Sequence, residues 1–404
     1  MLININSLLM DSLKLPQFRT IYEFADLIGL SSRLLYCLSM KTNNYYKQAL
    51  IPKCNGMYRE INIPSYTLNI VQRWILVNIL DKLSPSTRAM AFRRGSLYGH
   101  KQNALYHAHT FFGLSIDLKD FFPSIYSNKV YTIFSNIGYN RFASTILTNI
   151  CTLNGKLPQG SACSPAISNI ICISLDKRII GLCDKRGIRF TRYADDMYFS
   201  CDDKTLLLKI YPIIKMIIEN EGFIINDRKV FFHTPSNRKR ITGVTISTIS
   251  NDDNIRLKAP KELKKKIRAE IFKCIISGKY ELKSHILGEI AYVAYIENVN
   301  NESYLSRIKR YISNIAKKYC HYPELIEAYN KNIFYKDLEF QKAKIISATD
   351  EEDFSYYSCE LNKRKKFLQK NNLNDICRYS EWPLEIFNDY YQPNDDVSSN
   401  DLPF

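Results

Sequence analysis

The 404-residue sequence lacks the patterns that define several common classes of protein. Its 11 cysteines include no Cys-x-x-Cys pair and no cysteine–histidine cluster at zinc spacing, so neither a zinc site nor a disulfide framework is indicated. Free thiols fit a reducing cytoplasm. No apolar run approaches the ~20 residues of a membrane span, and the first residues lack a basic region followed by an apolar core. We therefore expect a soluble, cytoplasmic protein that is not exported.

Acidic residues are scarce over most of the chain. There are 56 lysines and arginines against 40 aspartates and glutamates, a net charge of +16. From residue 337 onward the balance reverses, with 14 acidic and 8 basic residues, which leaves +22 on residues 1–336. A basic body of this kind predicts a polyanionic partner such as a nucleic acid. The competing interpretation is that excess lysine merely keeps the protein in solution.

Two neighbouring carboxylates stand out in the segment Arg192–Ser200, which is Arg-Tyr-Ala-Asp-Asp-Met-Tyr-Phe-Ser. The β-favouring residues on either side predict a hairpin with Asp195 and Asp196 at its tip. For a lone pair of aspartates, a solvated turn is the simpler interpretation, because turns are rich in Asp. A third acid changes this balance, since Asp117 ends another predicted strand, residues 112–117, just before a Phe-Phe-Pro turn.

The two strands would bring the three carboxylates together if they lie side by side. Carboxylates so close repel one another and raise each other's pKa unless a divalent cation binds between them. Oxygen ligands favour Mg²⁺ or Mn²⁺ over Zn²⁺. Two such ions, typically ~3.5–4 Å apart, activate an attacking hydroxyl and stabilise a leaving pyrophosphate. The three acids therefore predict polymerase chemistry.

Three segments resemble successive core motifs of reverse transcriptases, in the order of that family. They are Ser-Ile-Asp-Leu-Lys-Asp-Phe-Phe from Ser115, Leu-Pro-Gln-Gly-Ser-Ala-Cys-Ser-Pro from Leu157 and Tyr-Ala-Asp-Asp from Tyr193. The resemblance implies an α+β right-hand polymerase with fingers, palm and helical thumb, and an RNA-directed DNA polymerase activity. The implied ligands of two Mg²⁺ ions, which Mn²⁺ can replace, are Asp117, Asp195, Asp196 and the backbone of Leu118.

The sequence after the Asp-Asp hairpin is typical of a polymerase palm. Residues 206–219 predict a helix and residues 222–230 predict a further strand. A helix between strands suggests the ferredoxin-like β-α-β-β-α-β arrangement of a polymerase palm.

The resemblance also implies which residues contact the incoming nucleotide. Arg59 would bind the triphosphate, and Lys229 would protonate the leaving pyrophosphate. Gln159 would contact the incoming nucleotide from a loop that lies beside the templating base. Arg59 can instead be an ordinary edge-strand arginine, and Lys229 an ordinary surface lysine. The backbone from Leu118 to Phe121 would line the triphosphate, and the Phe122 ring would clash with a 2′-hydroxyl and so select deoxynucleotides. Core packing is the alternative for both aromatic rings.

Two short patterns resemble hallmarks of retron reverse transcriptases. They are Asn103-Ala-x-x-His107 and Ile241-Thr242-Gly243, the second with Ile in place of the usual Val. Asn103 and His107 share one helix face, where core packing is the simpler interpretation. The basic amphipathic helix expected over residues 260–275 could follow an RNA backbone or present a solvated face. The expected RNA contacts are Asn103, His107, Arg93, Arg94, Lys264, Lys265 and Arg268.

The resemblance covers roughly residues 50–320 and implies a domain organisation. We expect a helical segment at 1–50, fingers and palm at 51–245, a helical thumb at 246–320 and a helical extension at 321–404 with a disordered end.

Membership of the retron type would imply a specific substrate and setting. The enzyme would copy part of a bound structured non-coding RNA into single-stranded DNA from deoxynucleotide triphosphates, primed from a 2′-hydroxyl of that RNA. The setting would be anti-phage defence with an effector protein and without a membrane. The alternatives are another bacterial reverse transcriptase, defence-associated or group II intron-like, and a non-catalytic RNA-binding scaffold.

Overall fold

The computed structural model describes most of the chain up to residue 311. The described residues are 10–52, 56, 58–235, 239–249, 252–277, 283–297, 307–308 and 310–311. The chain divides into two compact units, Met1–Thr242 and Gly243–Phe404. This division lies close to the expected end of the fingers and palm at residue 245, whereas the expected extension lies outside the described residues. Among the described residues, no helix has the length and apolar character needed to cross a membrane.

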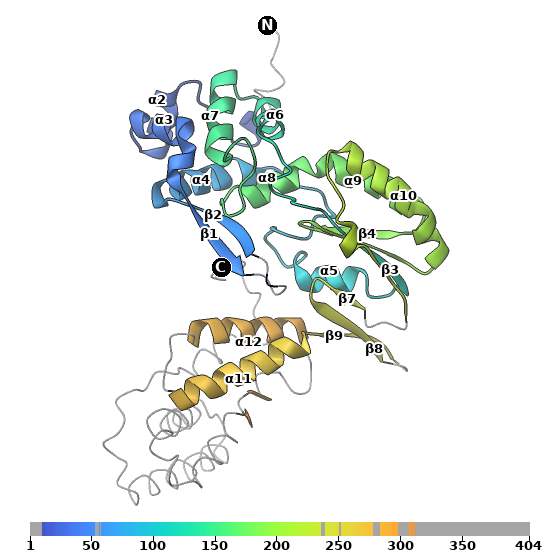
Figure 1. The fold of residues 1–404 in the computed structure, drawn as a ribbon. Coiled ribbons are helices and arrows are strands. Elements are labelled where there is room, and N and C mark those ends of the chain that lie inside the picture. Colours follow the sequence, from blue (N-terminus) through green and yellow to red (C-terminus); the bar gives the residue numbers. More distant parts are fainter. Residues whose placement is uncertain are drawn as a thin grey trace, which may run out of the picture. The chain divides into compact units, whose positions relative to one another are not determined.

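A helical pair and a β-hairpin follow one another near the start of the described residues (Figure 1). These elements are α2 (Ile21–Ile28), α3 (Ser32–Met40), η1 (Thr42–Tyr45), β1 (Tyr46–Pro52) and β2 (Tyr58–Pro64). The Thr20 and Ser31 side chains cap the two helices by accepting from backbone amides of the first turn. The expectation of a mainly helical start is therefore right for α2 and α3. It is wrong for β1, which pairs along its whole length with β2.

Seven helical segments occur in the next part of the chain, between residues 66 and 184. They are α4 (Tyr66–Asn78), η2 (Leu80–Lys82), α5 (His100–Tyr106), α6 (Ser127–Ile137), α7 (Arg141–Cys151), α8 (Ser164–Ile171) and α9 (Ile173–Asp184). Gly138 separates α6 from α7 with φ of 125°, a conformation that glycine adopts without strain.

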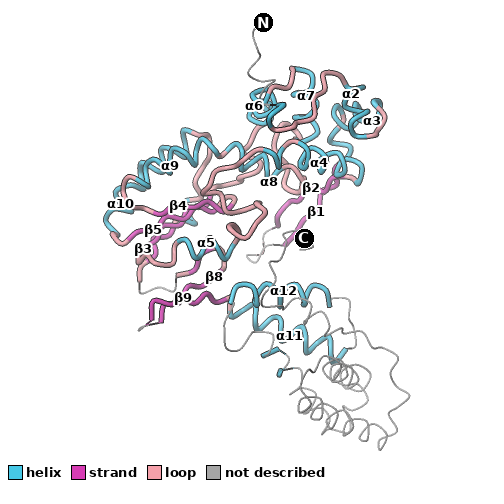
Figure 2. The backbone as a smooth tube through the Cα atoms, turned by 180° about the vertical axis from the view of Figure 1, so that it is seen from behind, coloured by secondary structure: helices cyan, strands magenta, loops and turns pink. Residues whose placement is uncertain are grey.

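The palm is a four-stranded antiparallel sheet in the order β4-β5-β3-β6. Its strands are β3 (Phe112–Asp117), β4 (Arg189–Tyr193), β5 (Asp196–Cys201) and β6 (Phe231–His233). Helices α6, α7, α8 and α9 lie between β3 and β4 in the chain, and α10 (Lys204–Asn220) lies between β5 and β6. This is the expected β-α-β-β-α-β order. Helices α9 and α10 lie on one side of the sheet and α5 on the other (Figures 1 and 2).

The strand expected over residues 222–230 forms only in part. Ile225 makes an isolated antiparallel bridge with Leu118, in which the Asn226 amide donates to the Asp117 carbonyl and the Lys119 amide to the Ile224 carbonyl, each at 2.8 Å. Residues Asp227–Lys229 then form a 3-10 turn, η3, and β6 begins only at Phe231.

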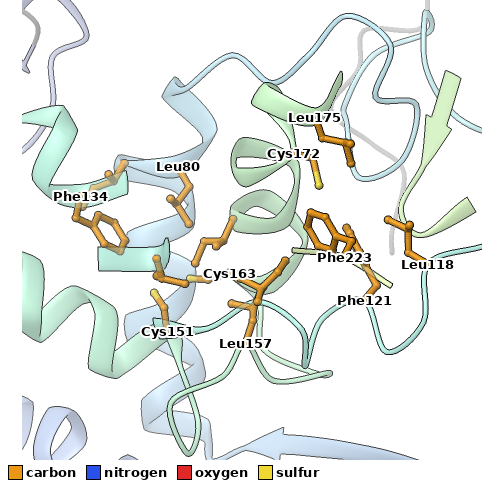
Figure 3. Close-up of a cluster of buried hydrophobic side chains, with 14 of the residues drawn as sticks. Leu80, Leu118, Phe121, Phe134, Cys151, Leu157, Cys163, Cys172, Leu175 and Phe223 are labelled. Carbon is orange, nitrogen blue, oxygen red and sulfur yellow. The ribbon is translucent and has the colours of Figure 1, made fainter. Parts of the chain in front are cut away.

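Buried apolar side chains hold the end of β3 in place. Leu118, Phe121 and Phe223 lie near Cys172 and Leu175 in the core (Figure 3). The rings of Phe121 and Phe223 have centroids 5.7 Å apart. Burial of each large apolar side chain contributes about 1.5–3 kcal/mol. Asp117 is therefore presented from a strand whose next residue, Leu118, is anchored in the core.

A short strand, β7 (Arg240–Ile241), closes the first unit, and the second unit has a hairpin followed by helices. Its described elements are β8 (Val244–Ile249), β9 (Asp252–Lys258), α11 (Lys261–Ser277) and α12 (Lys283–Glu297). The buried Glu297 carboxylate accepts from the Ala259 amide at 3.1 Å, from Arg307 at 3.3 Å and from Lys264. These bonds fix α12 against the start of α11, where the sequence predicts thumb helices.

Candidate active site

The β4–β5 hairpin carries the Asp-Asp pair on a two-residue turn. Tyr193 pairs with Asp196, so Ala194 and Asp195 form the turn itself. Ala194 has φ of 57°, a left-handed conformation that is strained for a residue with a side chain. The predicted hairpin with acids at its tip is confirmed.

The third acid meets this tip across the sheet. In the antiparallel register of β3 and β5, Asp117 lies directly opposite Asp196. The Leu118 amide donates to the Asp195 carbonyl at 3.0 Å, which ties the end of β3 to the turn. The two strands therefore lie side by side, as the sequence predicts, and bring the three carboxylates to one edge of the palm.

Burial and neighbouring carboxylates raise the pKa of Asp195 and of Asp196. For Asp195, burial is the main cause and Asp117 adds to it, while the positive charges of Lys229 and Arg59 act in the opposite direction. Partial withdrawal from water, reinforced by Asp195 and Asp117, raises the pKa of Asp196 to about 6. The charged forms of Asp195 and Asp196 are thus disfavoured in the protein alone, because burial and carboxylate repulsion exceed the effect of the nearby cations.

Two side chains beside η3 hold Asp117. Lys229 Nζ lies 2.7 Å from Asp117 Oδ1, and Asn226 Nδ2 donates to Asp117 Oδ2 at 3.1 Å. The hydrogen bond to Asp117 raises the pKa of Lys229, so its ammonium is charged at neutral pH. Sequence reasoning selected Lys229 but missed Asn226, which has the appearance of an ordinary turn residue before Asp227.

The donor set fits a hard divalent cation. Asp117, Asp195 and Asp196 offer only carboxylate oxygens, which Mg²⁺ and Mn²⁺ prefer. Burial and the neighbouring carboxylates raise the pKa of Asp195 and Asp196, and a bound cation would offset both effects.

The fingers hairpin and the Gln159 loop are in contact beside these acids. Asn62 on β2 donates its amide to the Gln159 carbonyl at 2.8 Å. Gly160 has φ of 129°, and a Cβ at this position would lie 2.3 Å from the Asn62 carbonyl oxygen. Gly160 therefore permits close approach of β2, and the chain has no room for a larger residue here. Arg59, exposed on the same strand, contributes positive potential at Asp195.

The two phenylalanines after Asp117 separate into different environments. The side chain of Phe121 is buried in the core, as the core-packing alternative has it, and the expected contact of its backbone with the triphosphate stays a prediction. Phe122 is half-buried, and its ring centroid lies 6.2 Å from that of Phe92.

Comparison with known proteins identifies the family. A family model described as reverse transcriptase (RNA-dependent DNA polymerase) matches residues 51–246. The Retron Ec86 reverse transcriptase of Escherichia coli is 34% identical over 317 residues, which cover 78% of this chain and 95% of that protein. The chain belongs to the retron reverse transcriptases. The Retron Mx65 reverse transcriptase of Myxococcus xanthus is 29% identical over 320 residues, 73% of this chain and 72% of that protein.

Family membership establishes the reaction class. This retron reverse transcriptase is an RNA-directed DNA polymerase, and enzymes of this family use divalent metal ions. The geometry described above gives its three acids a position that suits that chemistry.

The Asn103–His107 hallmark of this reverse transcriptase is enclosed by the palm. His107 is hydrogen-bonded to Ser200 Oγ at 2.7 Å and to Thr191 Oγ1 at 2.8 Å, and Thr191 donates to Asn103 Oδ1 at 2.6 Å. Burial lowers the pKa of His107, so the ring is neutral. The expectation that Asn103 and His107 contact RNA is wrong, because both side chains are buried and fasten α5 to β4 and β5.

The other expected RNA contacts differ in how freely they are presented. Arg93 stacks 3.7 Å above the Tyr98 ring and donates to the Ser86 carbonyl at 2.9 Å, whereas the Arg94 side chain is 78% exposed. In the second unit, Lys264 is half-buried and paired with Glu297, so its charge is largely balanced within the protein, and its contact with RNA stays a prediction. The two remaining residues, Lys265 and Arg268, are exposed.

Proposed function

We propose that Asp117, Asp195 and Asp196 are the catalytic carboxylates and hold two Mg²⁺ ions, with the Leu118 backbone completing the site. The direct pairing of Asp117 with Asp196 across β3 and β5 is the observation that carries this proposal. When bound, the cations activate the attacking hydroxyl and stabilise the leaving pyrophosphate.

The surrounding side chains bind and orient the nucleotide. Arg59 binds the triphosphate, and Gln159 orients the nucleotide from the loop that is bonded to β2. Lys229, charged beside Asp117, donates a proton to the pyrophosphate as it leaves. Phe122 excludes the 2′-hydroxyl of a ribonucleotide.

The template is a structured non-coding RNA that stays bound to the enzyme. The net charge of +16 and the exposed Arg94, Lys265 and Arg268 support contact with a polyanion. A 2′-hydroxyl of this RNA primes synthesis, so the product is a branched RNA–DNA molecule. The enzyme acts in the cytoplasm, in anti-phage defence, together with an effector protein.

The decisive test is incorporation of deoxynucleotides on a primed RNA template. We expect Mg²⁺-dependent synthesis by the full chain and a loss of about 10³-fold or more in the Asp195→Asn plus Asp196→Asn variant. Asp202→Asn, at the far end of β5, is the matched control and retains activity. Synthesis that persists in the double variant would refute the catalytic assignment.

A second experiment addresses the template. Nucleic acid that copurifies with the full chain is sequenced before and after debranching. A covalent RNA–DNA branch is the expected result, whereas an unbranched DNA product would refute priming from a 2′-hydroxyl.

A further inference from the structure

A fully buried guanidinium lies behind the catalytic turn. The side chains of Arg192 on β4 and Asp176 on α9 are both 0% exposed. Arg192 donates from Nε and Nη2 to the two carboxylate oxygens of Asp176, each at 2.8 Å. This bidentate geometry neutralises a charge that would be strongly destabilising if it were buried alone.

The remaining arm of this guanidinium reaches the turn itself. Arg192 Nη1 donates to the Ala194 carbonyl at 3.3 Å and to Asn169 Oδ1 at 3.1 Å. The Ala194 carbonyl belongs to the peptide that leads into Asp195. Arg192 therefore stabilises the left-handed conformation of Ala194 and, with it, the direction in which Asp195 is presented.

Asn169 on α8 connects this guanidinium to a second strained residue. Its side chain is buried, and Nδ2 donates to the Ala91 carbonyl at 2.9 Å. The next residue, Phe92, has φ of 58°, which is rare for an aromatic residue, and remains 49% exposed beside Phe122. Such strain persists only where the surrounding structure enforces it, and it concentrates at functional sites.

Backbone hydrogen bonds also join the segment before Phe92 to β4. The Arg192 amide donates to the Arg88 carbonyl at 2.9 Å, and the Met90 amide donates to the Arg192 carbonyl at 2.8 Å. Residues 88–91 thus run along β4, and Asn169 fastens the end of this segment from the other side.

We propose that Asn169 is a positioning residue that holds the Asp195 turn, through Arg192, and the ring of Phe92 in one arrangement. Phe92 then forms a second aromatic wall beside Phe122 and contributes to the exclusion of ribonucleotides. This inference rests on the proposed function, because it requires Phe122 to face the sugar of the incoming nucleotide.

The test compares two buried amide side chains of the same unit. Gln72 is the matched control, because it donates to Tyr46 Oη at 2.7 Å and to the Ile150 carbonyl at 2.9 Å and has no bond to the catalytic hairpin. Steady-state kcat and KM are measured with deoxy- and ribonucleotides for the full chain, Asn169→Leu and Gln72→Leu, together with their melting temperatures.

We expect both variants to melt lower by a similar amount but to differ in catalysis. Asn169→Leu lowers kcat for deoxynucleotides by about 10- to 100-fold, since small displacements of reacting groups cost this much. It also lowers the preference for deoxynucleotides about tenfold. Gln72→Leu leaves both quantities within about twofold of the original. Equal kinetics of the two variants would overturn the proposal.

A second variant separates the two hydrogen bonds of the Asn169 side chain. It also provides a test if Asn169→Leu does not fold. Asn169→Asp keeps an acceptor for Arg192 but loses the donor to Ala91, so sugar preference falls while kcat stays within about threefold. In a Phe92→Ala background, Asn169→Asp no longer changes sugar preference, because the two residues act as one unit. Unchanged preference in Asn169→Asp, or independent effects of the two changes, would overturn the proposal. An inactive original enzyme would refute the proposed function instead.

Discussion

The palm hairpin has carboxylates on its two sides, and they differ in how their charge is balanced. Behind it, Asp176 is fully buried and accepts hydrogen bonds from Nε and Nη2 of Arg192. In front, Asp195 and Asp196 have raised pKa values, because burial and mutual repulsion exceed the effect of nearby cations. A charge neutralised within the protein supports the fold, whereas a charge left unbalanced is suited to a ligand.

The second unit shows the same contrast with the opposite sign. Lys264 reaches the buried Glu297, while Lys265 and Arg268 present their charges to solvent from the same helix. Position along α11 alone does not separate these roles. The partner of each cation does.

The largest expected effect concerns the buried ion pair of Asp176 and Arg192. Asp176→Asn leaves Arg192 buried without a counter-charge, so we expect the free energy of unfolding to fall by about 3–5 kcal/mol. Urea unfolding of the metal-free protein measures this. Asp196→Asn is the matched change, and we expect no loss of metal-free stability because it removes repulsion. Similar losses in both variants would contradict the distinction.

Lys229→Met tests the cation that partly balances Asp117. If Lys229 donates a proton in the reaction, kcat falls about 100-fold. Lys215, an exposed lysine 3.9 Å from Glu219, provides the control variant Lys215→Met. A kcat for Lys229→Met equal to that of the control would show that Lys229 is an ordinary surface lysine.

The pH dependence of metal binding tests the carboxylates in front of the hairpin, whose charges are not balanced within the protein. The pKa of Asp196 is about 6 in the folded protein against 3.8 for a free side chain, so the metal-free folded state binds more protons between these values. Its contribution to metal-free stability is therefore present below about pH 4 and is lost as the pH rises through about 6. We expect Mg²⁺ to raise the melting temperature more at about pH 7.5 than at about pH 5, because protons compete with the cation at the lower pH. An equal Mg²⁺ effect at both values would contradict the assignment.

The smallest effect concerns the exposed cations of α11. Replacing Lys265 and Arg268 together by Gln should reduce the slope of log affinity against log salt by about 1.4 for single-stranded RNA. Fluorescence anisotropy of a labelled RNA at several salt concentrations measures the slope. Lys264→Gln should instead lower the melting temperature and leave the slope unchanged. A change of slope in Lys264→Gln alone would reverse the two roles.

Local patterns predicted the palm hairpin because they depend on neighbouring residues. Alternation around Asp195 and Asp196 and the strand ending at Asp117 follow from side-chain periodicity and turn chemistry. Their convergence required the pairing of β3 with β5, which the family resemblance supplied and the register confirms.

Other features depend on contacts between distant parts of the chain, which no local pattern contains. Asn226 holds Asp117 from 109 residues away. Asn103 and His107 have polar side chains that suit RNA contact or a buried network equally well, and only the packing of α5 on the palm decides between them. The same holds for Asp176, which resembles any helical acid until its arginine partner is seen.

The bond between β2 and the Gln159 loop has a mechanical consequence. Arg59 and Gln159, expected at opposite ends of a nucleotide, sit on segments that touch through Asn62, and Gly160 leaves no slack between their backbones. A displacement of the β1–β2 hairpin that keeps the Asn62 bond must carry the Gln159 loop with it. Under the roles proposed for Arg59 and Gln159, the groups that bind the two ends of the nucleotide would therefore move as one unit.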